Sequence, residues 1–211
     1  MTQDPVLRGV YLITPDQPDT AALLAATEPL LAAGVALLQY RNKSADAALQ
    51  RAQARALQAV CRDHGVPLVV NDDPGLAREV GAAGVHLGIN DGDIASARAA
   101  LGPRAIIGAS CYNRSDLARQ AAAAGASYVG FGAFFPSPTK PHAPRADVQQ
   151  LHDTAGLGVT RVAIGGLSPD NAGALVAAGA DLLAVVSGIY SAADPVAALR
   201  AYHACLEGNT R

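Results

Sequence analysis

Short apolar segments alternate with longer segments rich in alanine and leucine along the whole chain. The short segments end at polar residues or glycine, which is typical of parallel strands buried on both faces. The longer segments carry apolar residues at helical spacing, and either Ser44 or Asp46 could cap the second of them. The predicted strands are 9–13, 35–38, 66–70, 84–87, 105–108, 127–132, 161–164 and 182–186, and the predicted helices are 20–33, 46–64, one from 74, 93–101, 115–124, 146–155, 169–178 and 194–206.

Eight strand–helix units in 211 residues fit the α/β class and a closed (β/α)8 TIM barrel. The alternation requires a parallel sheet, because parallel neighbours need a crossover connection. An open doubly wound sheet is the alternative, but no GxGxxG motif opens the first strand–helix turn. No linker or low-complexity stretch divides the sequence, so we expect residues 1–211 to form a single catalytic domain.

Residues 66–91 read as a strand, a helix and a second strand. A right-handed crossover puts the carboxyl ends of both strands at one edge of the sheet, so Asp72 and Asp91 should lie side by side there. Two carboxylates would repel each other unless a cation lay between them, and oxygen ligands on short loops suit Mg²⁺. The alternative is that Asp72 caps the helix that begins at Pro74, although Asp73 already supplies a cap.

Composition excludes several classes of function. Half of the residues are hydrophobic, yet no apolar run approaches the roughly 20 residues that a membrane span needs. The first residues lack the basic start and apolar stretch of a signal peptide, so we expect a cytoplasmic protein. A net charge of −2 with dispersed arginines argues against nucleic-acid binding. The three cysteines, Cys61, Cys111 and Cys205, fit neither a disulfide framework nor a zinc site. The sequence leaves a homo-oligomer possible.

The active site of a (β/α)8 barrel is built from the loops that follow the strands. The polar residues at these positions are Gln39, Arg41, Lys43, Asn71, Asp72, Asp91, Ser110, Ser137, Thr139, Lys140 and Ser187. They include three cations and two carboxylates, but no Cys–His or Ser–His pair that would indicate covalent catalysis. Cations beside a Mg²⁺ site predict a substrate with several phosphate charges, such as a pyrophosphate.

Glycines follow the seventh and eighth predicted strands, at Gly165-Gly166 and Ser187-Gly188. These two loops form the usual phosphate site of such barrels, where glycine lets backbone N–H groups approach an anion. The alternative is that the glycines only make a tight turn. A second anion site beside the metal site favours two phosphorylated substrates over one bisphosphate.

The sequence says less about the roles of three further groups of residues. The proline-rich stretch 136–144 could cover the site with Lys140 pointing inward, or it could be a rigid connector. His86 lies within a predicted strand and is interpreted as an interior histidine without a catalytic role. Cys111 and Tyr112 are placed in a loop, with no role assigned.

Seven motifs along the chain together resemble the thiamine phosphate synthase family. They are QYRNK at 39–43, NDDPGLA at 71–77, GVHLGIND at 84–91, GAS at 108–110, GFGAFFPSPTK at 130–140, IGGLSPDN at 164–171 and AVVSGI at 184–189. The resemblance implies a (β/α)8 barrel that joins 4-amino-5-hydroxymethyl-2-methylpyrimidine pyrophosphate to thiazole phosphate. The products are thiamine phosphate and pyrophosphate.

The resemblance also implies a role for each matching residue. Asp72 and Asp91 would bind Mg²⁺. The pyrimidine pyrophosphate would be held by Gln39, Arg41, Lys43, Asn71, Ser110 and Lys140, and the thiazole phosphate by Ser137, Thr139, Gly166, Val186 and Ser187. The family often has an acidic residue where Asn42 stands and threonine where Ser137 stands. Serine keeps the hydroxyl, whereas Asn42 leaves the role of its position open.

The implied reaction loses pyrophosphate first and leaves a pyrimidine cation that the thiazole nitrogen captures. It needs no general base, and the developing charge would be neutralised by Mg²⁺, Arg41, Lys43 and Lys140. Two alternatives stay open: a related barrel that isomerises the thiazole phosphate, and a non-catalytic regulatory barrel that binds phosphate ligands. Neither needs a clamp for a leaving group.

Overall fold

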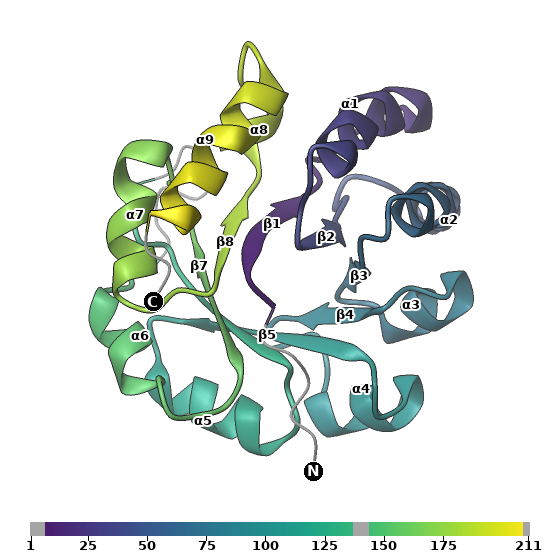
Figure 1. Ribbon diagram of the computed structural model, residues 1–211. Coiled ribbons are helices and arrows are strands. Elements are labelled where there is room, and N and C mark those ends of the chain that lie inside the picture. The colour runs from purple at the N-terminus through teal and green to yellow at the C-terminus, as the bar shows by residue number, and fades with distance from the viewer. Residues whose placement is uncertain (1–6, 137–143, 209–211) are drawn as a thin grey trace.

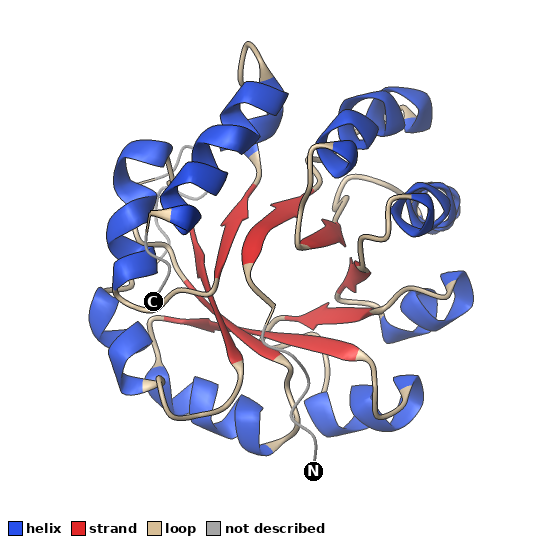
Figure 2. Cartoon of the chain, viewed as in Figure 1, coloured by secondary structure: helices blue, strands red, loops and turns tan. Residues whose placement is uncertain are grey.

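The computed structural model describes residues 7–136 and 144–208 and shows a closed barrel of eight parallel strands in sequence order (Figure 1). The strands line the centre and the helices form an outer ring around them (Figure 2). This confirms the predicted single-domain (β/α)8 TIM barrel. The strands are β1 (Gly9–Ile13), β2 (Leu37–Tyr40), β3 (Leu68–Asn71), β4 (Gly84–Leu87), β5 (Ile106–Tyr112), β6 (Tyr128–Phe131), β7 (Thr160–Ile164) and β8 (Leu182–Val185).

Most of the helices begin at an aspartate whose side chain accepts a hydrogen bond from an amide of the first turn. At α2 the cap is Asp46, and at α3 it is Asp73, whose Oδ1 accepts from the N–H of Leu76 at 2.8 Å. The alternative that Asp72 caps this helix is therefore wrong. The helices are α1 (Thr20–Ala32), α2 (Ala47–Asp63), α3 (Pro74–Val80), α4 (Ile94–Leu101), α5 (Ser115–Ala123), α6 (Val148–Asp153), α7 (Pro169–Ala177), α8 (Ser187–Tyr190) and α9 (Pro195–Glu207).

Alternation along the strands divides the core into two clusters, because successive side chains point to opposite faces of the sheet. The outward-facing residues, such as Leu38, Val70 and Ile107, pack against the helices in the larger cluster. The inward-facing residues form a smaller cluster that fills the barrel interior. That interior cluster comprises Tyr11, Ile13, Leu37, Val69, Tyr128, Val162, Leu182 and Ala184.

The strand boundaries differ from prediction where apolar residues precede a strand. β2 and β3 begin two residues later than predicted, because Val35 and Val66 pack against the core from the loops before them. β5 is longer than predicted and runs through Ser110 to Tyr112, with a bulge between these two residues. The expected loop position of Cys111 and Tyr112 is therefore wrong, since the pairing of β5 with β6 continues past the polar Ser110 to Tyr112.

A short helix, α8, directly follows β8 and was not predicted. It is too short for a periodic apolar pattern to reveal it. Among the residues that the structure describes, no helix has both the length and the apolar character that crossing a bilayer requires.

Two glycine-to-alanine substitutions test how closely β4 and β5 approach each other. A Cβ at Gly84 would lie 1.7 Å from the carbonyl oxygen of Ile106, whereas a Cβ at Gly173 in α7 meets nothing within 4 Å. We expect Gly84→Ala to lower the free energy of unfolding by about 3 kcal/mol, because backbone atoms cannot yield. Gly173→Ala should raise it by up to about 1 kcal/mol through helix propensity. Urea denaturation measures both, and equal stabilities would contradict this packing.

Candidate active site

Polar residues occupy the inward-facing positions at the carboxyl ends of β2 to β5. Gln39 shares the inner face of β2 with Leu37, Asn71 shares that of β3 with Val69, and Ser110 follows Gly108 on β5. Asn71 pairs in register with His86 on β4. The strand order therefore brings the predicted residues Gln39, Asn71 and Ser110 to one end of the barrel, above the apolar interior.

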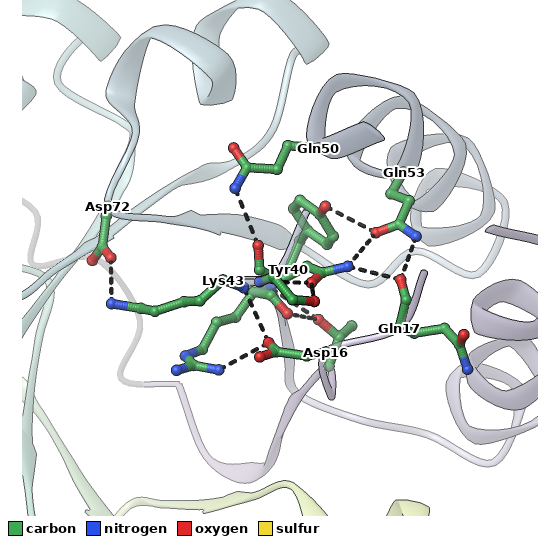
Figure 3. A network of polar contacts seen from close by, with 11 residues as sticks. Asp16, Gln17, Tyr40, Lys43, Gln50, Gln53 and Asp72 are labelled. Atoms are coloured by element: carbon green, nitrogen blue, oxygen red, sulfur yellow. Dashed lines mark hydrogen bonds and ion pairs between the residues drawn. The ribbon is translucent and has the colours of Figure 1, made fainter. Parts of the chain in front are cut away.

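The loop after β2 carries Arg41 and Lys43, and the loop after β1 holds it in place (Figure 3). The N–H of Arg41 donates to Thr14 Oγ1, which in turn donates to the carbonyl oxygen of Arg41, both at 2.8 Å. Asp16 Oδ1 accepts from the N–H of Lys43 at 3.0 Å and pairs with Arg41 Nη1 at 3.2 Å. The two cationic side chains thus start from a fixed backbone.

Asn42, between these two cations, turns into the protein instead of toward a ligand. The residue is 4% exposed, and Nδ2 donates to the carbonyl oxygen of Gln17 at 2.7 Å and to Gln53 Oε1 at 3.0 Å. Its Oδ1 accepts from the hydroxyl of Ser44 at 2.8 Å. The role left open for position 42 is therefore structural: the amide ties the β2–α2 loop to α2 and to the β1–α1 loop.

Tyr40 completes this buried group (Figure 3), with its hydroxyl donating to Gln53 Oε1 at 3.0 Å. Burial, together with the nearby negative charge of Asp16, raises the pKa of Tyr40 to about 12. The phenol therefore stays protonated and remains a donor. Gln53 Nε2 donates in turn to the carbonyl oxygen of Gln17 at 2.8 Å.

Lys43 and Asp72 meet at the rim, where Nζ lies 3.1 Å from Oδ2 (Figure 3). The two side chains are 56% and 27% exposed, so the pair faces solvent and contributes little to stability. Asp72 has a φ of 62°, which is uncommon for a residue other than glycine, and its N–H donates to the carbonyl oxygen of His86 at 2.8 Å. Backbone strain of this kind gathers at functional sites.

Asp91 lies in the loop after β4, the strand next to the one that Asp72 follows. A Cβ at Gly88 would lie 2.3 Å from Asp91 Oδ2, so the glycine leaves room for this carboxylate. In residues 7–136 and 144–208, no group of three or more His, Cys, Asp or Glu could enclose a metal ion. The carboxylates of Asp72 and Asp91 are oxygen ligands of the kind that suits Mg²⁺, which keeps water and shares its coordination with substrate phosphates.

The second anion site that the sequence predicts would lie in the loops after β7 and β8. Gly165 and Gly166 have φ of 98° and 64°, and a Cβ at Gly166 would lie 2.4 Å from the carbonyl oxygen of Pro136. The turn itself requires both glycines, so their presence alone does not distinguish a phosphate site from a tight turn. Val186 is the N-cap residue of α8 and Ser187 is its first residue, which places the predicted pair beside a helix start.

Ser137, Thr139 and Lys140 lie outside the described residues, as does most of the predicted 136–144 cover. The two ends of this segment are fixed at the rim between β6 and β7. The N–H of Ala133 donates to the carbonyl oxygen of Pro144 at 3.0 Å, and the N–H of Phe134 donates to that of Ile164 at 3.2 Å. Ala133, Phe134 and Pro144 therefore lie at the end of the barrel that carries Arg41, Lys43 and Asp72.

Two groups near the site were missed by sequence reasoning. Asp16 follows β1 and could have been found, because it stands at the same strand-end position as the other candidates. Tyr11 and Tyr128 have no comparable signal, since nothing local shows that they meet inside the barrel. His86 contacts both Tyr128 and the candidate Ser110, each at 2.9 Å.

Comparisons with known proteins agree with this geometry. The family model described as thiamine monophosphate synthase matches residues 10–189. A thiamine-phosphate synthase from Xanthomonas campestris pv. campestris (strain 8004) is 64% identical over 197 residues, which cover 93% of this chain and 95% of that protein. One from Methylobacillus flagellatus is 53% identical and covers 94% of this chain and 95% of its own length.

Solved structures show the same fold. Thiamine phosphate pyrophosphorylase from Pyrococcus furiosus has a TM-score of 0.83 at 29% identity, over 95% of this chain and 96% of that one. A 3-hexulose-6-phosphate synthase, at 20% identity and a TM-score of 0.70, shares the fold alone. The family match spans every candidate residue of the rim. The chain therefore belongs to the thiamine monophosphate synthase family.

Proposed function

We propose that the barrel rim built by Arg41, Lys43, Asp72 and Asp91 makes thiamine phosphate by releasing pyrophosphate before the new bond forms. The chain is a transferase that condenses the pyrimidine pyrophosphate with the thiazole phosphate, two small phosphorylated substrates. The observation that carries the mechanism is the meeting of Lys43 and Asp72, 3.1 Å apart, beside the fixed Arg41. Cation and carboxylate at one point suit a phosphate-rich leaving group and its metal ion.

Three cationic side chains would neutralise the departing charge. Asp16 and Thr14 hold the backbone around Arg41 and Lys43, so these two need little rearrangement when the charge develops. Lys140, proposed from the sequence, would be the third. A planar guanidinium can take two phosphate oxygens at once, whereas each ammonium acts as a compact point charge.

Asp72 and Asp91 would hold one Mg²⁺ ion. Bound there, the ion would supply positive charge to the pyrophosphate oxygens as the C–O bond breaks. In support, Asp72 has a positive φ, and Gly88 leaves room for the carboxylate of Asp91 in the loop after the next strand. Helix capping falls to Asp73 and Asp93.

The remaining rim residues would hold the two substrates. Gln39, Asn71 and Ser110 supply neutral polar groups on the inner faces of neighbouring strands, which suits a pyrimidine ring. The thiazole phosphate would lie at the opposite side, on the Gly166 turn and at Val186 and Ser187, with Ser137 and Thr139 completing its site. Capture of a cation by the thiazole nitrogen requires no general base, in keeping with the absence of one from this proposed set.

We also place the protein in the cytoplasm. Cys61, Cys111 and Cys205 are all unpaired thiols, and a reducing compartment keeps thiols in this form.

A direct assay tests the proposal. The purified protein is mixed with the pyrimidine pyrophosphate, the thiazole phosphate and Mg²⁺, and both thiamine phosphate and pyrophosphate are measured. We expect the two products in equal amounts, and no product when either substrate is left out. Conversion of a thiazole phosphate isomer alone would support a tautomerase, and ligand binding without turnover would support a regulatory barrel. Either outcome would contradict the proposal.

Asp91→Asn should weaken metal dependence without unfolding the chain. Removing one of two carboxylate ligands should raise the Mg²⁺ concentration for half-maximal rate by about tenfold or more. Rates measured over a Mg²⁺ titration provide the test, with Asp63→Asn on the exposed end of α2 as the control carboxylate. A wild-type titration curve for Asp91→Asn would remove this residue from the metal site.

Lys140→Ala should lower kcat more than it raises KM. A charge that acts mainly on the departing pyrophosphate contributes more to the transition state than to substrate binding. Loss of one such preorganised contact typically costs on the order of 100-fold in kcat. Steady-state kinetics over both substrates give the two constants, and an unchanged kcat would show that Lys140 has no part in the chemical step.

A further inference from the structure

A chain of hydrogen bonds crosses the barrel interior and connects two of the proposed substrate-binding residues. Gln39 Nε2 donates to the hydroxyl of Tyr11, and the Tyr11 and Tyr128 hydroxyl oxygens are 2.6 Å apart. The Tyr128 hydroxyl lies 2.9 Å from His86 Nδ1, and His86 Nε2 lies 2.9 Å from Ser110 Oγ. These residues come from β2, β1, β6, β4 and β5. The chain therefore joins strands far apart in the sequence.

The residues of this hydrogen-bond chain are closely packed inside the barrel. Tyr11 and Tyr128 are 1% and 0% exposed and belong to the apolar cluster inside the barrel. Their rings meet edge to face at 5.5 Å, and the His86 ring lies nearly parallel to that of Tyr128. A Cβ at Gly108 would lie 1.9 Å from Tyr128 Cζ, so the phenol occupies the space that this glycine leaves.

The donors in this chain point in one direction. The Gln39 amide donates into Tyr11, and burial raises the pKa values of both phenols, so each keeps its proton. Tyr11 then donates to Tyr128, and Tyr128 donates to His86 Nδ1. In the opposite direction, Tyr11 would receive two donors, and its own buried O–H would lack an acceptor among the described hydrogen bonds. That arrangement would incur the cost of an unpaired buried donor.

A ring nitrogen that accepts a hydrogen bond carries no proton, so neutral His86 has its proton on Nε2 and donates to Ser110 Oγ. The Ser110 oxygen is then occupied as an acceptor on its inner side. Its own O–H is left to donate toward the mouth of the barrel. The direction of the hydrogen bonds thus determines that the Ser110 hydroxyl can donate to a ligand.

We propose that Tyr128 and His86 are positioning residues that hold Ser110 as a hydrogen-bond donor toward the pyrimidine pyrophosphate. The proposal rests on the proposed function only in naming the ligand that Ser110 faces. In this role His86 acts through Ser110 and carries no proton to or from a substrate. Its place inside the barrel agrees with an interior histidine, but its orientation gives it a part in substrate binding.

The first experiment measures the histidine tautomer without any substrate. Protein labelled with ¹⁵N in the imidazole rings is examined by NMR, and His86→Gln identifies the signals of His86. We expect a protonated Nε2 and an unprotonated Nδ1 in the wild type, because Tyr128 donates to Nδ1. Tyr128→Phe should shift the signals toward a mixture of tautomers. A wild-type His86 with its proton on Nδ1, or on both nitrogens, would overturn the proposal.

Tyr190→Phe is the matched control for this measurement. It also removes a phenol hydroxyl with a side-chain partner, Thr27 Oγ1 at 2.9 Å, but this pair joins α8 to α1 outside the barrel interior. The His86 signals should be unchanged in this variant. An equal change in both tyrosine variants would show that the shift reflects general loosening, and would also overturn the proposal.

The second experiment compares two replacements of His86 by kinetics. His86→Gln keeps an N–H that can donate to Ser110 Oγ and should hold kcat/KM for the pyrimidine pyrophosphate within about threefold. His86→Leu removes the donor and should lower it by about tenfold, as expected for one lost hydrogen bond. In a Ser110→Ala background the leucine variant should cause little further loss, because the two side chains act as a unit.

Additive losses in that double variant would overturn the proposal, as would equal losses for glutamine and leucine. If His86→Leu does not fold, Tyr128→Phe replaces it in the same cycle. A wild-type protein without synthase activity would contradict the proposed function, while the tautomer measurement would still decide the orientation of His86.

Discussion

Closure of the barrel is the constraint on which the rest of the structure depends. Every second residue of each strand faces the packed barrel interior, so a polar group buried there needs a hydrogen-bond partner. The apolar members of the interior cluster meet this constraint by packing. The polar members meet it through a continuous series of hydrogen bonds, which runs from Gln39 through Tyr11, Tyr128 and His86 to Ser110. A fold requirement thereby also orients side chains at the mouth.

The charged side chains of the rim, in contrast, remain in contact with solvent. The Arg41–Asp16 and Lys43–Asp72 pairs are both partly exposed, and such pairs contribute little to the free energy of unfolding. What they fix is position. Asp16 accepts hydrogen bonds from both the Arg41 side chain and the Lys43 backbone amide, so it fixes the Arg41 guanidinium relative to the β2–α2 loop.

The sequence predicted those features that depend on local signals. Alternating apolar segments revealed the eight strands, and strand ends located Asp72 and Lys43, since a barrel collects these ends at one face. It could not reveal the pairing of Tyr11 with Tyr128, because the two hydroxyls meet across 117 positions of sequence. It also ended β5 at a polar residue, although Ser110 faces the interior and Cys111 the helices. Polarity marks a strand end only when the interior is entirely apolar.

Asn42 shows how an unusual residue can be explained by its partners. Its Nδ2 donates to two acceptors, the carbonyl oxygen of Gln17 and Gln53 Oε1. A carboxylate in this place would face both acceptors without a proton to donate, and it would be buried at the cost of its hydration. Gln53 Oε1 already accepts from Tyr40, so its amide could turn its donor toward position 42 only by abandoning that bond. The asparagine and the glutamine therefore belong together, and an acidic residue at position 42 requires a different partner on α2.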